Sequence, residues 1–137
     1  MNQLSAEYRE LEQPIVFHAI GWVENQFNET AAPEVIKAVQ SRIVLDPSYI
    51  DALLGLEVRQ EILVLFYFHL SQGYQLQQHP RADKNRPLRG VFALRSPQRP
   101  NAIGVTRVSL LAIDENVLSV AGLDAINDTP VLDIKPA

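Results

Sequence analysis

The feature that most restricts the fold of this chain is an unbroken apolar run from Ile62 to Phe68, inside the segment EILVLFYFH at residues 61–69. The run is far shorter than the about 20 residues that a membrane-spanning helix needs. It carries no charge and is rich in β-branched and aromatic side chains, which favours a strand over a helix. We therefore predict a strand over residues 61–69 that is buried on both faces.

The other apolar segments are also short, and turn-forming residues separate them. They predict strands over residues 15–23, 43–45, 90–94, 103–113, 117–121 and 131–134. Asp46 followed by Pro47 predicts the start of a short helix over residues 48–54, which Gly55 ends. Loops are expected over residues 24–32, 73–88 and 95–101.

Strands do not alternate with helices along the chain, which argues against a Rossmann-type parallel sheet. The sequence instead predicts a mainly β fold, a single barrel-like domain or a coiled antiparallel or mixed sheet, with one or two short helices and long loops. We expect a polar leader over residues 1–13 and one domain over residues 14–137.

Several classes of function lack their defining residues. The 137 residues contain no cysteine, which excludes disulfides and thiolate catalysis. His18, His69 and His79 have no metal-ligand spacing, and no phosphate-binding loop or nucleophile elbow is present. We expect neither a metal nor a membrane partner. The first residues do not form a secretory signal, so a cytoplasmic location is expected.

Basic residues concentrate in one part of an otherwise acidic chain. The formal net charge is −4, yet residues 81–107 hold seven basic side chains and one acidic side chain. Within this part, Pro97 and Pro100 stiffen a loop that carries Arg95, Arg99 and Asn101. Two interpretations stay open: the arginines form a receptor for carboxylate or phosphate groups, or they pair with acidic neighbours and fix the loop.

The segment GVFALRSPQRPNAIG at residues 90–104 resembles the GVFATRSPxRPNPIG signature of the TsaA-like family, typified by tRNA methyltransferase O. Four further segments resemble family elements in the same order, at residues 17–23, 43–57, 63–69 and 122–136. The sequence departs from the family at Glu24-Asn25-Gln26, where many members read Arg-Ser-Pro, and at Glu34, where an arginine is usual.

The resemblance implies a β-barrel-like fold that binds S-adenosyl-L-methionine, in a pocket shared by the two subunits of a homodimer. It implies methyl transfer to the exocyclic amine of threonylcarbamoyl-adenosine beside the anticodon of tRNA. Carried over by motif, the cofactor-binding residues are His69, Leu70, Arg95, Val105, Leu123, Asp124, Ala125 and Ile126.

Asp124 is the acidic group expected nearest the chemistry, where it would assist the attacking amine as a catalytic residue. A role in capping its turn is the alternative. Substrate-binding residues are expected in the basic part of the chain, at Arg86, Arg89, Arg99 and Asn101. Three functions stay open: a tRNA methyltransferase, a non-catalytic module that senses S-adenosyl-L-methionine, and a methyltransferase with another substrate.

Overall fold

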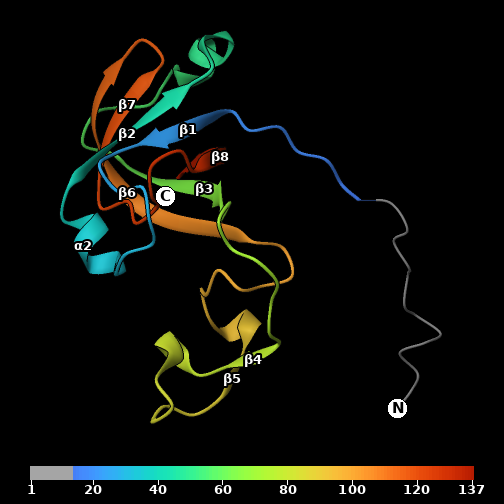
Figure 1. Ribbon diagram of the computed structural model, residues 1–137. Helices are drawn as coiled ribbons and strands as arrows, with labels where there is room; N and C mark the ends of the chain where they lie inside the picture. The colour runs from blue at the N-terminus through green and yellow to red at the C-terminus, as the bar shows by residue number, and fades with distance from the viewer. Residues whose placement is uncertain (1–13) are drawn as a thin grey trace.

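Six antiparallel strands close into a barrel in the order β1-β2-β7-β6-β3-β8 (Figure 1). The computed structural model describes residues 14–137, so the expected leader over residues 1–13 lies outside the described residues. The mainly β, barrel-like fold predicted from the sequence is confirmed. The barrel strands are β1 (Gly21–Glu24), β2 (Gln40–Leu45), β3 (Glu61–Tyr67), β6 (Ile103–Asp114), β7 (Val117–Ala121) and β8 (Pro130–Pro136).

Alternating side chains of the strands fill the barrel. On β3, Ile62, Val64 and Phe66 are at most 2% exposed, whereas Tyr67 on the other face is 43% exposed. The prediction that this strand is buried on both faces is wrong, because a closed barrel is a single layer: the outward side chains of Leu63 and Leu65 are only partly buried. Each inward Ile, Val or Phe contributes about 1.5–3 kcal/mol through burial.

The pairing of β3 with β6 depends on Gly104. A Cβ atom there would lie 2.6 Å from the ring of Phe66 and 2.8 Å from that of Phe68. These two rings meet edge to face, with centroids 5.1 Å apart. Gly104 therefore lets two aromatic rings occupy the space beside the strand.

Two short helical elements lie at opposite ends of the barrel. The helix predicted after Asp46 forms as the 3-10 helix η1 (Pro47–Leu53), and the Asp46 side chain accepts a hydrogen bond from the Ser48 amide. The α-helix α2 (Pro33–Lys37) was not predicted. It has five residues and a single buried side chain, Ile36, too little for a periodic pattern.

The first predicted strand is too long. Residues 15–17 are extended but 70–74% exposed, and β1 begins only at Gly21. The strand β1 is short because its partner β8 pairs with it only through Val131 and Pro130. Extended backbone without a partner does not make a strand.

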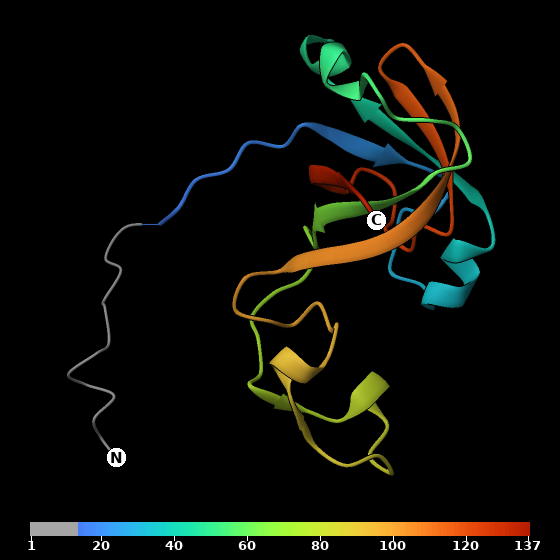
Figure 2. The same cartoon turned by 180° about the vertical axis from the view of Figure 1, so that it is seen from behind.

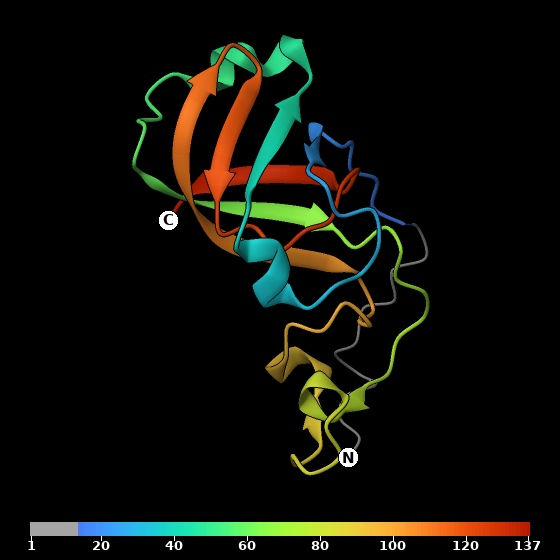
Figure 3. The same ribbon diagram turned by 60° about the vertical axis from the view of Figure 1, so that its left-hand side comes forward.

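Residues 69–101 form a separate lobe between β3 and β6, which we call the flap (Figures 2 and 3). It contains β4 (Gln77–Gln78), the 3-10 helices η2 (Pro80–Ala82) and η3 (Val91–Ala93), and β5 (Arg89–Gly90). The predicted strand over residues 90–94 is wrong beyond Gly90, because the next residues turn into η3 and bury Val91 inside the flap. Figure 3 shows α2 at the barrel end that faces the flap.

Candidate functional site

The loop between β7 and β8 presents the Asp124 side chain at the end of the barrel that faces the flap. Leu123 and Ala125 are 0% and 4% exposed, so their side chains anchor the loop in the core. Asp124 lies between them and its side chain is 26% exposed. Any contact from Leu123 or Ala125 to a ligand would therefore come from the backbone, whereas Asp124 offers its carboxylate.

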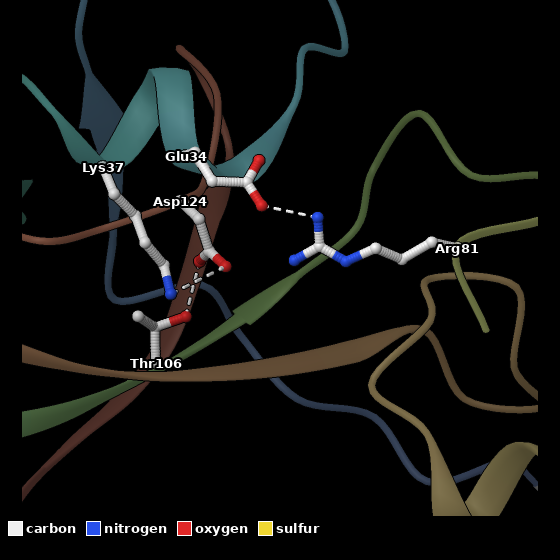
Figure 4. A network of polar contacts seen from close by, with 5 residues as sticks. All are labelled: Glu34, Lys37, Arg81, Thr106 and Asp124. Atoms are coloured by element: carbon white, nitrogen blue, oxygen red, sulfur yellow. Dashed lines mark hydrogen bonds and ion pairs between the residues drawn. The ribbon is translucent and has the colours of Figure 1, made fainter.

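Two residues hold the Asp124 carboxylate (Figure 4). The hydroxyl of Thr106, a residue 6% exposed on β6, donates a hydrogen bond of 2.5 Å to Asp124 Oδ1. Lys37 of α2 approaches the same carboxylate, with Nζ 4.0 Å from Asp124 Oδ2. The carboxylate is thus oriented by a nearly buried donor and faces a cation.

Asn25 forms hydrogen bonds that hold the same loop against the barrel. Its side-chain amide donates to the Ala125 carbonyl at 2.9 Å and to the Ser41 hydroxyl at 3.0 Å. Its backbone N–H donates to Asn127 Oδ1 at 3.0 Å. Sequence reasoning treated Asn25 only as a departure from a family motif, and no local signal reveals a partner 100 residues away.

The arginines of the flap divide between two environments. Arg99 Nη1 donates to the carbonyls of Leu94 and Ser96 at 2.9 and 3.2 Å, which fixes the proline-rich loop. Arg86 pairs with Asp83 at 3.6 Å. The interpretation in which arginines fix loops and pair with neighbours therefore applies to these two.

Arg89 and Arg95 are different. Both are exposed, and neither forms an ion pair with any residue in the described range 14–137. They remain available for an anionic ligand.

A further ion pair joins the flap to the barrel. Arg81 Nη1 lies 2.5 Å from Glu34 Oε1 on α2 (Figure 4). The hydrogen bond from Arg81 holds the pKa of the Glu34 carboxyl below its usual value.

The other predicted site residues lie around the base of the flap. His69 and Leu70 follow β3, and Asn101 precedes β6. Val105 is 38% exposed on the outer face of β6, whereas its neighbour Thr106 points toward Asp124. The predicted residues thus gather at one end of the barrel without forming a single set of contacts.

A hollow of about 460 Å³ lies elsewhere, between η1 and the end of β8. Aliphatic and aromatic side chains, including Leu45, Tyr49 and Ile134, form much of its lining, and none of the predicted site residues borders it. Over residues 14–137, no cluster of three His, Asp or Glu side chains could hold a metal ion. No helix of the described part is long and apolar enough to cross a membrane.

The barrel, the loop that carries Asp124 and the flap can be compared with known proteins as one unit. The model of the tRNA-methyltransferase O N-terminal domain matches residues 22–137. The chain belongs to this family, as its sequence motifs predicted. The class expected from the sequence, an S-adenosyl-L-methionine-dependent methyltransferase, is confirmed with it.

Individual relatives agree with this assignment. A "probable S-adenosyl-L-methionine-binding protein" of Methanothermobacter thermautotrophicus is 38% identical over 91% of both chains. The human "tRNA (adenine(37)-N6)-methyltransferase" is 40% identical over 72% of this chain, which spans 22% of the human protein. A crystal structure of TrmO superposes with a TM-score of 0.71 and 32% identity, over 91% of this chain and 58% of the solved chain.

Proposed function

We propose that this protein transfers a methyl group from S-adenosyl-L-methionine to the exocyclic N6 amine of threonylcarbamoyl-adenosine beside the anticodon of tRNA. The observation that carries the proposal is the family match across residues 22–137. The human relative, whose name gives the N6 position of adenine 37 as its target, supports the choice of acceptor. Such a substrate implies a cytoplasmic location.

The polar groups at and around Asp124 are complementary to those of the cofactor. The ordered carboxylate can accept hydrogen bonds from hydroxyl or amino groups, and the exposed Arg95 guanidinium suits a carboxylate. His69 and Leu70 at the flap base, Val105, and the backbone of Leu123, Ala125 and Ile126 complete the proposed cofactor site. When bound, S-adenosyl-L-methionine supplies a methyl group activated by a positively charged sulfur.

Asp124 is the residue that we assign to the reacting amine. Methyl transfer to nitrogen requires that the amine be oriented and that it lose a proton. The Asp124 carboxylate can accept that proton or a hydrogen bond from it, and the Thr106 hydroxyl keeps the carboxylate in one orientation. The contact with Thr106 also ties the loop to β6.

The flap is our proposed RNA-binding surface. It carries six basic residues and one acidic residue, a net charge of +5. Arg89 and Asn101 are exposed there, and Phe92 is 82% exposed, which suits stacking on an unpaired base. Arg86 and Arg99 would contribute mainly by shaping the loops that they already contact.

We also propose a homodimer. Large apolar side chains of the flap lie in solvent in the single chain, and a surface of this kind marks an interaction site. These side chains are Leu70, Tyr74, Leu76 and Leu88, at 55–64% exposure. A second copy would cover them and bring further residues to the cofactor site.

The decisive experiment is a transfer assay with methyl-labelled S-adenosyl-L-methionine. One tRNA carries threonylcarbamoyl-adenosine beside the anticodon, and the matched control tRNA carries unmodified adenosine. Label in the modified nucleoside alone supports the proposal. Cofactor binding without transfer to either tRNA would identify a sensing module, and label in the control tRNA would mean another substrate.

A further inference from the structure

The helix α2 lies between the flap and the loop that carries Asp124, and it contacts both. Glu34 and Lys37 are one helical turn apart, which places them on the same side of α2. Glu34 reaches Arg81 of the flap, and Lys37 reaches Asp124 (Figure 4). Four residues thus connect the proposed RNA-binding surface with the proposed cofactor site.

The flap has few other polar attachments to the barrel. Within residues 14–137, every other side-chain hydrogen bond or ion pair made by the flap stays inside it, as for Ser71 with Pro97 and Gln78 with Gln98. At its base, the Phe68 N–H donates to the Ala102 carbonyl at 2.8 Å. The orientation of the flap therefore depends on this base and on the pair between Glu34 and Arg81.

The backbone at Arg81 and Ala82 adopts an unfavourable conformation. Arg81 and Ala82 have φ angles of 54° and 58°, in the left-handed region that residues other than glycine avoid. Hydrogen bonds from the Ala82 and Asp83 amides to the His79 and Pro80 carbonyls keep this turn. The unfavourable turn is what points Arg81 toward α2.

We propose that Glu34 and Arg81 form a positioning contact that holds the flap against α2, and thereby couples RNA binding on the flap to cofactor binding at Asp124. The inference rests on the proposed function and adds to it a pair of positioning residues. Both side chains are more than 60% exposed, so the contact is weak and can open and close. An opening flap admits a large RNA, and a closed flap presents it to the Asp124 loop.

The first test measures the position of the flap directly and needs neither ligand. The chain has no cysteine, so spin labels can be attached to Lys84→Cys on the flap and to Glu115→Cys in the turn between β6 and β7. We expect Glu34→Gln to broaden the distance distribution between the labels. The matched control is Glu61→Gln, which removes an ion pair to Arg107 of similar exposure on β3 and β6.

The charge-swapped double variant Glu34→Arg with Arg81→Glu should restore the narrow distribution. Equal distributions for the parent and Glu34→Gln would overturn the proposal, whatever the protein methylates. If the swap fails to restore what Glu34→Gln changes, the contact is not a charge pair and the proposal is equally wrong.

The second test measures coupling as the ratio of S-adenosyl-L-methionine dissociation constants without and with a modified tRNA anticodon stem-loop. We expect a ratio of about five or more in the parent, the usual lower range for coupled sites. In Glu34→Gln it should fall close to one, and in Glu61→Gln it should stay at the parent value. A loss of phosphate contacts cannot explain this result, because Glu34 does not bind phosphate.

A parent ratio of one, with both ligands bound, would refute the coupling and leave the methyltransferase intact. A parent that binds S-adenosyl-L-methionine but neither binds nor methylates tRNA would refute the proposed function instead. The distance measurement would still decide whether Glu34 and Arg81 hold the flap.

Discussion

Asp124 owes its orientation to the alternation of side chains along a short loop. Its neighbours Leu123 and Ala125 are buried, so the loop cannot rotate to hide or expose the carboxylate without uncovering apolar surface. Thr106 then supplies a hydrogen bond from the inner side of β6. A carboxylate held in this way binds a ligand without first losing rotational freedom.

Removal of the Thr106 hydroxyl tests this orientation. Thr106→Val keeps the shape of the side chain but leaves Asp124 without its donor. A hydrogen bond to a charged group contributes about 1.5–3 kcal/mol, and the partial exposure of Asp124 favours the lower value. We expect the dissociation constant of S-adenosyl-L-methionine to rise about tenfold in calorimetry, with Thr106→Ser close to the parent. If Thr106→Val binds S-adenosyl-L-methionine with unchanged affinity, Asp124 is not part of the cofactor site.

Asn25 is the second residue whose substitution is informative. Asn25→Ala removes the donors to the Ala125 carbonyl and the Ser41 hydroxyl, and Ser41 is 1% exposed. We expect urea unfolding to show a loss of about 1–3 kcal/mol. Asn28→Ala, which removes only an exposed contact to Asn127, should change stability by less than about 0.5 kcal/mol. Equal stability of the two variants would contradict this role.

At the scale of elements, the β3–β6 pair packs closely around Gly104. Gly104→Ala would place a methyl group 2.6 Å from the Phe66 ring, so the ring or the strand must move. We expect a loss of about 1–3 kcal/mol, measured as a lower urea midpoint. Phe66→Leu should recover part of that loss in the double variant, although by itself it destabilises the core. Additive losses would show that the two sites do not interact.

The start of η1 predicts a pH dependence. The Ser48 amide, and then its hydroxyl, donate to Asp46 and lower the pKa of this carboxyl below its ordinary value of 3.8. A carboxyl with a lowered pKa stabilises the fold above its unfolded pKa, and the effect is lost as the pH falls through the folded pKa. Asp46→Asn should therefore flatten the stability profile over about pH 2–4 in urea titrations. Asp51→Asn, in the same 3-10 helix, should keep the parent slope.

The molecule as a whole consists of a closed barrel and a flap that hardly share packing. The two ends of the flap meet at the Phe68–Ala102 hydrogen bond, in the register of β3 with β6. Replacement of residues 69–101 by Asn-Gly, a favoured two-residue hairpin turn, should leave a folded barrel. We expect cooperative thermal unfolding in circular dichroism and loss of tRNA binding. A shortened protein that does not fold would show that the flap supports the barrel.

The sequence predicted the barrel better than it predicted the contacts of the site. Alternation along residues 103–113 and 117–121 is a local property, and it sufficed for β6 and β7. The limits of β1 depend on β8, and the 3-10 helix after Gly90 depends on burial of Val91, neither of which is local. Residues 61–69 were predicted to be buried on both faces, but β3 is fully buried on only one face because the sheet closes into a barrel.

The sequence likewise predicted some residues of the candidate site but not the residues that contact them. Family motifs led to Asp124 and to the basic segment, but the partners of these residues come from distant parts of the chain. Thr106 is 18 positions from Asp124, and Glu34 is 47 from Arg81. Neither Lys37 nor Asn25 belongs to a sequence motif that indicates a role in the site. Such contacts follow from the closed barrel order and become visible only once the strands are placed.

The hydrogen bond between Phe68 and Ala102 at the root of the flap has an evolutionary consequence. An insertion whose ends already touch can lengthen, shorten or be exchanged at little entropic cost, since doubling a loop adds only about 0.6 kcal/mol. Relatives that share the barrel can thus differ in the proposed RNA-binding surface through changes in this single segment. The barrel and the loop that carries Asp124 would not have to change with it.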